Sequence, residues 1–395
     1  MKILYLADIR FPLERANGMQ TFETCRALAQ RGHWVTLFVR RDTSHPARDP
    51  WTFYDAPRDE QLVIVRASWA PGPVRRLSYQ LVAALRAMSR MPDVVLTRDL
   101  GVADALLRRG LHRLRAPIVY ESHGYAPAVS AEMPRLLAGV PAPSAAKLAR
   151  LTRRESRVWR RSDGYVTLTR VHQQELEDRF GTRRNAAVIP DGVRLARART
   201  FPEAPDSSVP LAVYAGHLYP WKGVERLIDA VALVPRLHAR IVGGQPGEGD
   251  RARLEARARE RGVADRVSFT GWLAPSAVAG ELARAHVLVL PNSRTHISER
   301  YTSPLKLFEY MAAGRPIVAS DLSALREVLR HDDNAVLVDP DSSQALADGI
   351  ARVLADPALA DRVARRAHQD VADYGWEVRA LRLEAVLGMA SGADA

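Results

Sequence analysis

Short apolar runs alternate with longer segments of helical spacing along the whole sequence. In the first half, β-rich runs of this kind occupy residues 2–8, 33–39, 61–67, 93–98, 117–122 and 164–169. In the second half they occupy residues 210–216, 239–244, 266–272, 285–291, 315–320 and 334–339. Such apolar runs, without strict alternation of polar and apolar positions, are typical of strands covered by helices on both faces. The pattern therefore predicts an α/β protein with doubly wound parallel sheets.

The alternation is interrupted once, at residues 196–210, where prolines and an Asp-Ser-Ser sequence replace the apolar periodicity. We therefore expect two Rossmann-like domains, residues 1–200 and 210–372, that face each other across a cleft. The amphipathic segment 375–393 predicts a last helix that packs on either domain, including back on the first. Because ligands of open α/β sheets bind beyond the carboxyl ends of the strands, the strand-end loops are the places to search for function.

Composition narrows the class of protein. The chain has 395 residues, no apolar run near the ~18 residues that span a bilayer, and an N-terminus without a signal-peptide layout. A single cysteine, Cys25, fits a reducing cytoplasm. The formal net charge is +12, but only four of the 57 basic residues are lysines. The arginine bias weakens any argument from arginine clusters and draws attention to the few lysines.

Two loops of the first half carry candidate residues. Gly18 lies where a helical pattern begins after the first strand, so a ligand can approach backbone N–H groups there; a plain turn glycine is the alternative. Glu121 and His123 lie at the carboxyl end of the fifth strand, and Gly124 follows them directly. The position of His123 at a strand end favours a functional role.

The loops of the second half place glycines and one lysine at strand ends. Gly216 and His217 follow the first strand, and Lys222 lies where the next helix begins, so its ammonium group is suited to neutralise a phosphate. Gly243 and Trp272 follow the next two strands, in turns whose backbone groups can contact a nucleobase.

Residues 299–321 read "ERYTSPLKLFEYMAAGRPIVASD". Ser303 is expected to be the N-cap of a helix and Pro304 its first residue. The residues expected to bind an anion at the start of this helix, with backbone N–H groups or a lysine side chain, are Thr302, Ser303, Leu305 and Lys306. Glu309 is six residues beyond Ser303, ~9 Å along the axis, which is about the reach from a diphosphate to an attached ribose. A capped helix with a surface glutamate is the alternative.

Together these residues resemble the retaining glycosyltransferases of family 4, which have the two-domain GT-B fold. The matching motifs are "GHLYPWKG", "VIPDGV", "FTGW", "SPLKLFEYMAAGRPIVASD" and "LREVL", with looser matches at "RGHWVTLF" and "YESHG". The resemblance implies an N-terminal acceptor-side domain, a C-terminal nucleotide-sugar-binding domain and transfer of a sugar to an acceptor hydroxyl. The biosynthesis of a glycan, a glycolipid or a secondary metabolite is the implied setting.

The resemblance also implies roles for single residues. Lys222 binds the donor diphosphate, the backbone at 303–305 holds the phosphates, Glu309 binds the ribose, and His123 faces the transferred sugar. The chain departs from the family at two positions. Tyr301 stands where a sugar-binding glutamate is common, with Glu299 two residues away, and His217 stands where an arginine is frequent. These changes put recognition of the sugar in question.

Several other functions and contacts remain open. A GT-B phosphorylase, a nucleotide-sugar epimerase and a non-catalytic nucleotide- or nucleic-acid-binding protein are alternatives, although no nucleic-acid motif is present. No ligand cluster suggests a metal, and we expect no cofactor besides the nucleotide sugar as co-substrate. The basic segment 145–163 predicts either peripheral contact with an anionic membrane, on the inner face of the cell membrane, or a solvated arginine-rich helix.

Overall fold

The computed structural model of the protein describes most of the chain. The described residues are 1–42, 46–67, 79, 82, 83, 85, 91–108, 116–137, 139–195, 201–203, 205, 209–244 and 250–392. Much of the expected linker, residues 196–200, 204 and 206–208, lies outside them.

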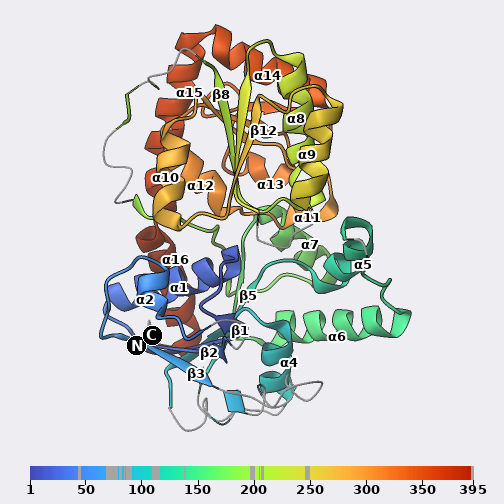
Figure 1. Ribbon diagram of the computed structural model, residues 1–395. Helices are drawn as coiled ribbons and strands as arrows, with labels where there is room; N and C mark the ends of the chain where they lie inside the picture. The colour runs from blue at the N-terminus through green and yellow to red at the C-terminus, as the bar shows by residue number, and fades with distance from the viewer. Residues whose placement is uncertain are drawn as a thin grey trace. The chain divides into compact units, whose positions relative to one another are not determined.

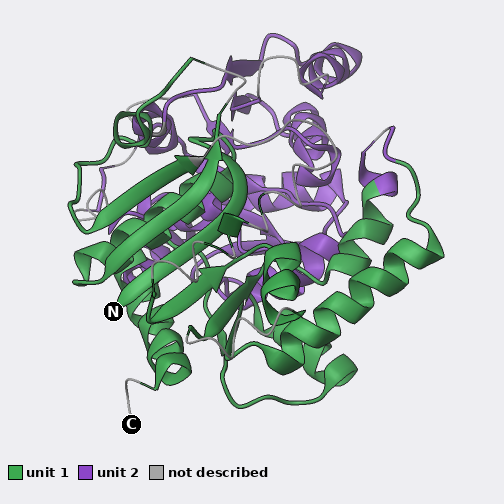
Figure 2. Cartoon of the chain, turned by 90° about the horizontal axis from the view of Figure 1, so that it is seen from below, with its two compact units in different colours: residues 1–133, 141–192, 376–395 green, residues 134–140, 193–375 purple. Residues whose placement is uncertain are grey.

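The chain divides into two compact units (Figure 2). Unit 1 contains residues 1–133, 141–192 and 376–395, and unit 2 contains residues 134–140 and 193–375. The main division thus falls between residues 192 and 193, and the C-terminal helix α16 (Trp376–Ser391) belongs to unit 1.

Unit 1 contains a seven-stranded parallel sheet (Figure 1). Its strands are β1 (Lys2–Phe11), β2 (Trp34–Arg41), β3 (Leu62–Ala67), β4 (Val94–Thr97), β5 (Ile118–Ser122), β6 (Gly164–Thr167) and β7 (Ala186–Val188). The order is β3-β2-β1-β4-β5-β6-β7, and Leu4 of β1 lies opposite Thr36 on one side and Val95 on the other. The chain reverses its direction of winding between β1 and β4.

The helices of this half are α1 (Ala16–Gln30), α2 (Pro50–Phe53), α4 (Leu100–Arg108), α5 (Ala126–Leu136), α6 (Ala145–Arg161) and α7 (Arg170–Phe180). Helix α16 packs against α1 and against strands β4, β5 and β6. A segment from the far end of the chain therefore completes the core of unit 1.

Unit 2 contains a six-stranded parallel sheet of the order β10-β9-β8-β11-β12-β13. Its strands are β8 (Leu211–Ala215), β9 (His238–Val242), β10 (Val267–Gly271), β11 (Val287–Leu290), β12 (Ile317–Ser320) and β13 (Val336–Val338). Its helices are η3 (Pro220–Lys222), α8 (Val224–Leu233), α9 (Asp250–Glu260), α10 (Pro275–Ala283), α11 (His296–Arg300), α12 (Leu305–Ala312), α13 (Ser323–Arg326), α14 (Ser343–Ala355), α15 (Pro357–Asp370) and η4 (Val371–Tyr374).

Helices bury both faces of this second sheet (Figure 1). Ala212 and Tyr214 of β8 belong to the apolar cluster that includes α8, α9 and α14, whereas Val213 and Ala215 belong to the cluster that includes α10, α12 and α13. Successive residues of a strand point to opposite faces, so a strand covered on both sides needs a continuous apolar run. This physical requirement is why the apolar runs in the sequence predicted the strands.

The predicted fold class is confirmed, and each of the twelve predicted apolar runs overlaps a strand. Sequence analysis missed β7, whose three residues are only partly buried and give little apolar signal. No helix of the described residues is long and apolar enough to cross a membrane.

Candidate functional site

The sheet of unit 2 reverses its direction of winding between β8 and β11, which are neighbours in the sheet although two strands separate them in sequence. In open α/β sheets this switch point is where strand-end loops diverge and leave space for a ligand. The loops that follow β8 and β11 are residues 216–223 and 291–304. They contain the candidate residues Gly216, His217 and Lys222 and the segment 301–304, and three further candidates, Leu305, Lys306 and Glu309, lie in α12.

Glycines allow these loops to approach each other closely. Gly216 has φ +137°, and a Cβ atom there would lie 2.6 Å from Nζ of Lys306. Gly223 has φ +69°, and a Cβ atom there would lie 1.8 Å from the carbonyl oxygen of Pro291. The backbone N–H of Ser293 also donates a hydrogen bond to the carbonyl of Trp221 at 3.0 Å. The two loops are thus packed backbone to backbone at the switch point.

Gly243 is explained by packing of the same kind. A Cβ atom there would lie 2.2 Å from the carbonyl oxygen of Gly216, and its N–H donates a hydrogen bond to the carbonyl of Gly271 at 3.0 Å. Gly216 and Gly243 are therefore required by close contacts within the protein. Their role in donor binding stays a prediction.

Helix α12 begins one residue later than the sequence suggested. Its N-cap is Pro304, with ψ 127°, no side-chain hydrogen bond caps the helix, and Leu305 is its first residue. The prediction that Ser303 is the N-cap was wrong. A proline restricts the residue before it to extended conformations, so Ser303 stays outside the helix. The first N–H groups of the helix itself are therefore those of Leu305 and Lys306, and anion binding by the backbone of Thr302 and Ser303 stays a prediction.

Two side chains one turn apart fix α12 against the end of β8. The hydroxyl of Tyr310 accepts a hydrogen bond from the backbone N–H of Ala215 at 2.7 Å. Nζ of Lys306, four residues earlier, lies 3.8 Å from the ring centroid of Tyr214. Because residues four apart share one helix face, Tyr310 anchors the face from which Lys306 reaches Gly216.

Lys306 and Lys222 are two lysines of unit 2 whose pKa values are both lowered. Nζ of Lys306 is buried and has no hydrogen-bond partner in the described part of the chain. Burial, and after it the positive charge of Lys222, lowers the pKa of Lys306 well below its ordinary value. Burial also lowers the pKa of Lys222 to about 8. A buried ammonium group without a hydrogen-bond partner is costly, and the positive charge of Lys222 adds to the cost at Lys306.

Glu309 is the fifth residue of α12 and is partly buried. Its carboxylate raises the pKa of Lys306, whereas burial and the charge of Lys222 lower it. The structure thus brings Lys222, Lys306 and Glu309 into one electrostatic neighbourhood at the switch point.

The side chains of the loop after β11 mainly contact one another. The ring of Tyr301 is buried, and its hydroxyl lies 2.9 Å from Nε2 of His296. The hydroxyl of Thr302 donates a hydrogen bond to the carbonyl of Ile297 at 3.2 Å. Glu299 accepts a hydrogen bond from the backbone N–H of Ser323 at 3.0 Å. The protein thus uses these side chains for its own structure, and donor contacts by Tyr301 and Thr302 stay predictions.

Aromatic side chains border the loop after β8. The ring of His217 stacks on Tyr219 with centroids 5.1 Å apart, and Tyr219 stacks on Trp221 at 4.7 Å. Trp272, after β10, keeps 44% of its surface exposed. The stack holds His217 in place, and the exposed ring of Trp272 leaves a face that can accept another planar group.

His123 lies in unit 1, at the end of β5, with 23% of its side chain exposed. Its Nε2 atom lies 2.7 Å from Oε1 of Glu121, a carboxylate that is fully buried. Gly18 is the third residue of α1, and a Cβ atom there would lie 2.6 Å from the carbonyl of Leu13 and from the hydroxyl of Tyr54. Close packing explains this glycine, whereas His123 keeps an exposed side suitable for a ligand.

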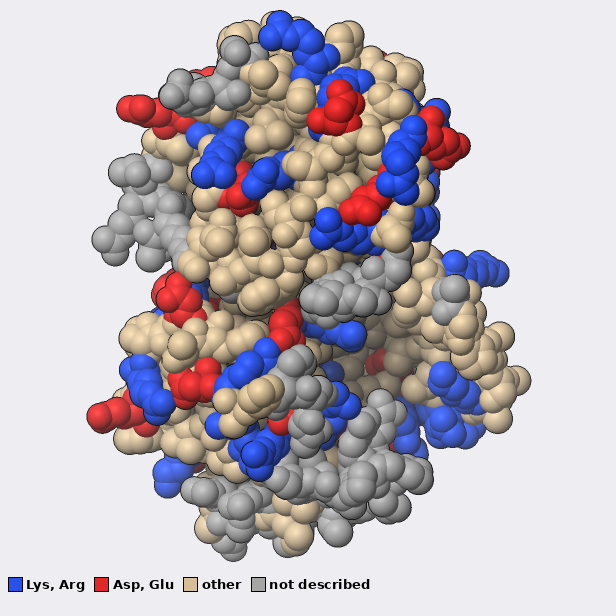
Figure 3. All heavy atoms as spheres, in the orientation of Figure 1, with Lys and Arg blue, Asp and Glu red and all other residues tan. Residues whose placement is uncertain are grey.

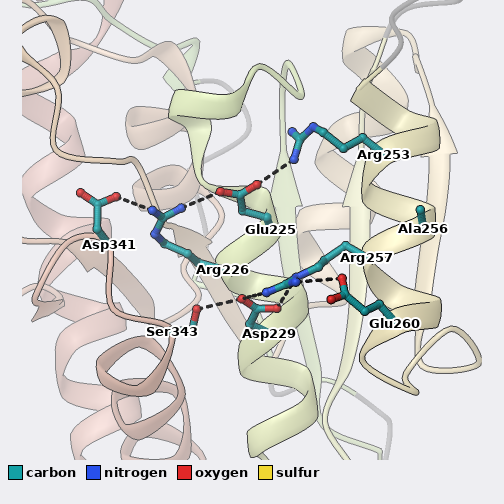
Figure 4. Close-up of a pocket in the computed structure, with 9 residues that line it drawn as sticks. All are labelled: Glu225, Arg226, Asp229, Arg253, Ala256, Arg257, Glu260, Asp341 and Ser343. Carbon is teal, nitrogen blue, oxygen red and sulfur yellow. Dashed lines mark hydrogen bonds and ion pairs between the residues drawn. The ribbon is translucent and has the colours of Figure 1, made fainter. Parts of the chain in front are cut away.

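A pocket on the outer face of α8 and α9 has a different character (Figure 4). Arg226 pairs with Asp341 at 2.8 Å, Arg253 pairs with Glu225 at 2.7 Å, and Arg257 pairs with Asp229 at 2.8 Å. Each of these arginines is neutralised by a neighbouring carboxylate, as the dashed lines in Figure 4 show. This pocket is therefore a network of surface ion pairs and gives no reason to expect an anionic ligand.

Sequence analysis did not find the residues that hold the site together. Tyr214 and Tyr310 look like ordinary core residues in the sequence. Asn292, two residues after the end of β11, is fully buried, and neither atom of its side-chain amide has a hydrogen-bond partner among the described residues. A polar residue directly after an apolar strand at the switch point was the one available signal for Asn292.

Two family models match the chain, one on each half. The model described as "Glycosyltransferase Family 4" matches residues 18–197, and the model described as "Glycosyl transferases group 1" matches residues 198–370. The first match includes His123, and the second includes Lys222, Lys306 and Glu309.

Curated relatives and solved structures agree with these matches. A D-inositol 3-phosphate glycosyltransferase of Xylanimonas cellulosilytica is 30% identical over 95% of this chain and 92% of its own length. An alpha-D-kanosaminyltransferase of Streptomyces kanamyceticus is 28% identical, with the match covering 40% of each chain. Among structures, a sucrose-phosphate synthase from Thermosynechococcus elongatus superposes with a TM-score of 0.80 at 20% identity over all of both chains. HepE of Anabaena, solved in complex with UDP-glucose, superposes with a TM-score of 0.75 at 18% identity over 98% of this chain and 99% of its own.

Replacement of Lys306 by methionine tests whether the charge of this lysine binds an anion. We expect Lys306→Met to stabilise the free protein by about 1 kcal/mol, because an apolar side chain of similar length replaces a buried unpaired charge. For a unit of this size that corresponds to about 2–4 °C in the midpoint of thermal unfolding. Inorganic diphosphate should raise the midpoint of the parent protein but not that of Lys306→Met.

Lys147→Met, which removes an exposed lysine of α6, is the matched control and should respond to diphosphate like the parent protein. A Lys306→Met variant that is less stable and still responds to diphosphate would contradict the assignment.

The lowered pKa of Lys222 predicts a pH dependence of stability. Between about pH 8 and the ordinary pKa of lysine, the unfolded chain binds more protons at this residue than the folded protein. The free energy of unfolding should therefore rise with pH in this window for the parent protein and rise less for Lys222→Met. Urea unfolding at pH 7.5, 8.5 and 9.5 measures the difference, and equal slopes for the two proteins would refute it.

Proposed function

The chain belongs to the glycosyltransferases of family 4, and from this premise we propose that it transfers a sugar from a nucleotide diphosphate sugar to an acceptor hydroxyl with retention of configuration. The observation that carries the proposal is the pair Lys222 and Lys306, two cations at the switch point of unit 2 without an ion-pair partner in the described residues. Two neighbouring ammonium groups match the two negative groups of a diphosphate.

The relatives support a sugar nucleotide as the donor. HepE of Anabaena was solved with UDP-glucose, and the relatives from Xylanimonas and Streptomyces are named as a D-inositol 3-phosphate glycosyltransferase and an alpha-D-kanosaminyltransferase. Glu309, in the same electrostatic neighbourhood as the two lysines, is proposed to accept hydrogen bonds from the ribose hydroxyls. Trp272 offers an exposed ring beside the glycine turn after β10, where a nucleobase can stack.

The proposed reaction exchanges one bond at the anomeric carbon for another. The bond from the anomeric carbon to the diphosphate oxygen breaks, a bond to the acceptor oxygen forms on the same face, and the acceptor proton passes to the departing diphosphate. The charge that develops on the leaving oxygen is stabilised by Lys222, by Lys306 and by the N-terminus of α12. These cations provide the charge stabilisation that a metal ion provides in other sites, so the proposed transfer needs none.

His123 is proposed to contact the transferred sugar. Burial, the positive charge of Arg98 and the nearby Arg379 together lower the pKa of His123 to about 4, despite the opposing effect of Glu121. The imidazole is therefore neutral at pH 7 and offers a hydrogen-bonding atom without a full charge.

Peripheral contact with an anionic membrane is the second part of the proposal, and α6 supports it. The exposed cations of this helix are Lys147, Arg150, Arg153, Arg160 and Arg161. Its glutamate, Glu155, is fully buried. Figure 3 shows basic side chains gathered over this helix. Each lysine or arginine near an anionic surface contributes ~1 kcal/mol to binding, so five are sufficient for reversible docking.

The role of Glu309 is tested by pairing a protein variant with a modified ligand. A thermal-shift screen of UDP, GDP, ADP and dTDP first identifies the preferred nucleotide. Glu309→Gln should then weaken binding of the corresponding ribonucleoside diphosphate about ten- to a hundredfold, because a charge-assisted hydrogen bond contributes ~1.5–3 kcal/mol.

The parent protein should bind the 2′- and 3′-deoxy forms of this nucleotide more weakly than the ribonucleotide. Glu309→Gln should bind the deoxy forms and the ribonucleotide equally, since the substitution and the loss of the hydroxyl remove the same hydrogen bond. Glu377→Gln, at an exposed position of α16, is the matched control. Independent losses in the variant and the deoxy ligand would exclude the ribose contact. Product analysis separates transfer from the alternatives: a phosphorylase yields a sugar phosphate, and an epimerase yields an isomerised donor without a new glycosidic bond.

Membrane docking is tested by co-sedimentation with vesicles of 30% phosphatidylserine and 70% phosphatidylcholine. We expect binding at 50 mM salt that is lost at 500 mM, because salt screens exposed charges. Arg150→Gln combined with Arg153→Gln should weaken binding severalfold.

The control is Arg352→Gln combined with Arg365→Gln, which removes two exposed arginines that are paired with Asp332 and Asp361. No binding at low salt, or an equal loss in the control, would show that α6 is only a solvated helix.

A further inference from the structure

One arginine of the C-terminal helix is buried inside unit 1 and joins several elements. Arg379 of α16 is 2% exposed. Its Nη2 donates to Oε2 of Glu121 at 2.8 Å, its Nη1 donates to the hydroxyl of Thr24 at 3.0 Å, and its Nε donates to the carbonyl of Pro190 at 3.1 Å. All three nitrogens of the guanidinium group are thus engaged, which fixes its orientation.

The carboxylate that Arg379 holds is shared with two further side chains. Oε1 of Glu121 accepts a hydrogen bond from Nε2 of Gln20 at 2.5 Å and lies 2.7 Å from Nε2 of His123. Gln20 is oriented in turn, because its Oε1 accepts a hydrogen bond from Nη1 of Arg98 at 2.5 Å. We call Gln20, Arg98, Glu121, His123 and Arg379 the Glu121 cluster.

The Glu121 cluster determines which nitrogen of His123 carries the proton. Burial alone opposes ionisation of Glu121, but Arg379 and His123 outweigh it and hold its pKa well below the usual range. An ionised carboxylate can only accept hydrogen bonds, so Nε2 of His123 must carry the hydrogen. The neutral imidazole then has a lone pair at Nδ1, and Nδ1 has no hydrogen-bond partner among the described residues.

We propose that Arg379 is a positioning residue for His123: through Glu121 it fixes the Nε2–H tautomer and the ring orientation, so that Nδ1 accepts a hydrogen bond from a hydroxyl of the transferred sugar. The contact with the sugar rests on the proposed function, whereas the tautomer does not. A residue more than 250 positions away in the sequence therefore sets the chemistry of the strand-end histidine.

The charges around His123 make the proposal sensitive to pH. The groups that act on it are Glu121 at the end of β5, Arg98 after β4 and Arg379 on α16. Asp191, which follows β7, lies 4.0 Å from Arg379, and burial raises its pKa to about 7. Removal of the Arg379 charge takes away a positive neighbour of His123 and should raise the pKa of the imidazole. Protonation of Nδ1 would convert it from an acceptor into a donor.

The first experiment measures the tautomer without any substrate. Nitrogen-15 spectra of the imidazole rings, with His123→Asn to assign the signal, should show a protonated Nε2 and an unprotonated Nδ1 at pH 7 in the parent protein. In Arg379→Met the Nδ1 signal should move toward that of a protonated nitrogen. Arg379→Lys keeps a positive charge near Glu121 and should keep the parent pattern. An Nδ1–H tautomer in the parent protein would overturn the proposal.

The second experiment measures the pH dependence of sugar transfer with the donor found by the screen. The acid limb of kcat should move toward neutral pH by at least one pH unit in Arg379→Met, with a fall in kcat at pH 7 of tenfold or more. It should stay near its parent position in Arg379→Lys. Arg382→Met is the matched control, because it removes an exposed arginine three residues further along α16. It should leave both the acid limb and kcat at pH 7 unchanged.

The outcomes separate positioning from a purely structural role. If Arg379 only stabilises the fold, Arg379→Met lowers the midpoint of unfolding while the acid limb and the nitrogen signals stay in place. If Arg379→Met does not fold, Glu121→Gln removes the carboxylate instead, and an unchanged single tautomer in that variant would refute the proposal. If no nucleotide sugar supports transfer, the proposed function fails, while the nitrogen spectra still decide the tautomer.

Discussion

A buried ammonium group without a hydrogen-bond partner among the described residues is the constraint on which the proposed chemistry of unit 2 depends. Nζ of Lys306 lies between the face of Tyr214 and the backbone of Gly216, and the positive charge of Lys222 makes its charged form less favourable still. The contact with the tyrosine ring offsets part of the cost of desolvation, since an aromatic face attracts a cation. An arrangement that is unfavourable within the protein alone is what the proposed function requires of a site organised before its ligand binds.

Backbone geometry makes this arrangement possible. A Cβ atom at position 216 would displace Lys306, and one at position 223 would separate the loops that follow β8 and β11. Tyr310 ties α12 to the last residue of β8, so the helix that carries Lys306 and Glu309 cannot shift away from the sheet without the loss of a buried hydrogen bond. The site is therefore a consequence of how two loops and one helix pack at the switch point.

The fold could be predicted from the sequence because strands covered on both faces must be apolar throughout, and twelve such runs are visible. The exception shows the limit: Ala186–Val188 form a strand although its residues are only partly buried, and a run of three carries no periodic signal. Lys222, Lys306 and Glu309 were accessible because lysines are rare in this chain and these lie at strand ends or helix starts. The boundary of α12 was placed one residue early, because cap preferences favour Ser303 whereas the proline after it excludes serine from the helix.

Arg379 shows why contacts between residues far apart in the chain could not be predicted from the sequence. In a chain with so many arginines, nothing distinguishes this one from the exposed Arg382 three residues later, and its partners come from α1, β5 and the segment after β7. The basic residues differ in whether a carboxylate pairs with them and in where that carboxylate lies, and only the three-dimensional structure shows this difference. The arginines beside α8 and α9 are neutralised by surface carboxylates and are structural. Arg379 is neutralised by Glu121, which also contacts His123, and so Arg379 is proposed to orient that histidine. Lys222 and Lys306 have no carboxylate in ion-pair contact among the described residues, and the proposal of a diphosphate ligand rests on this difference from the arginines.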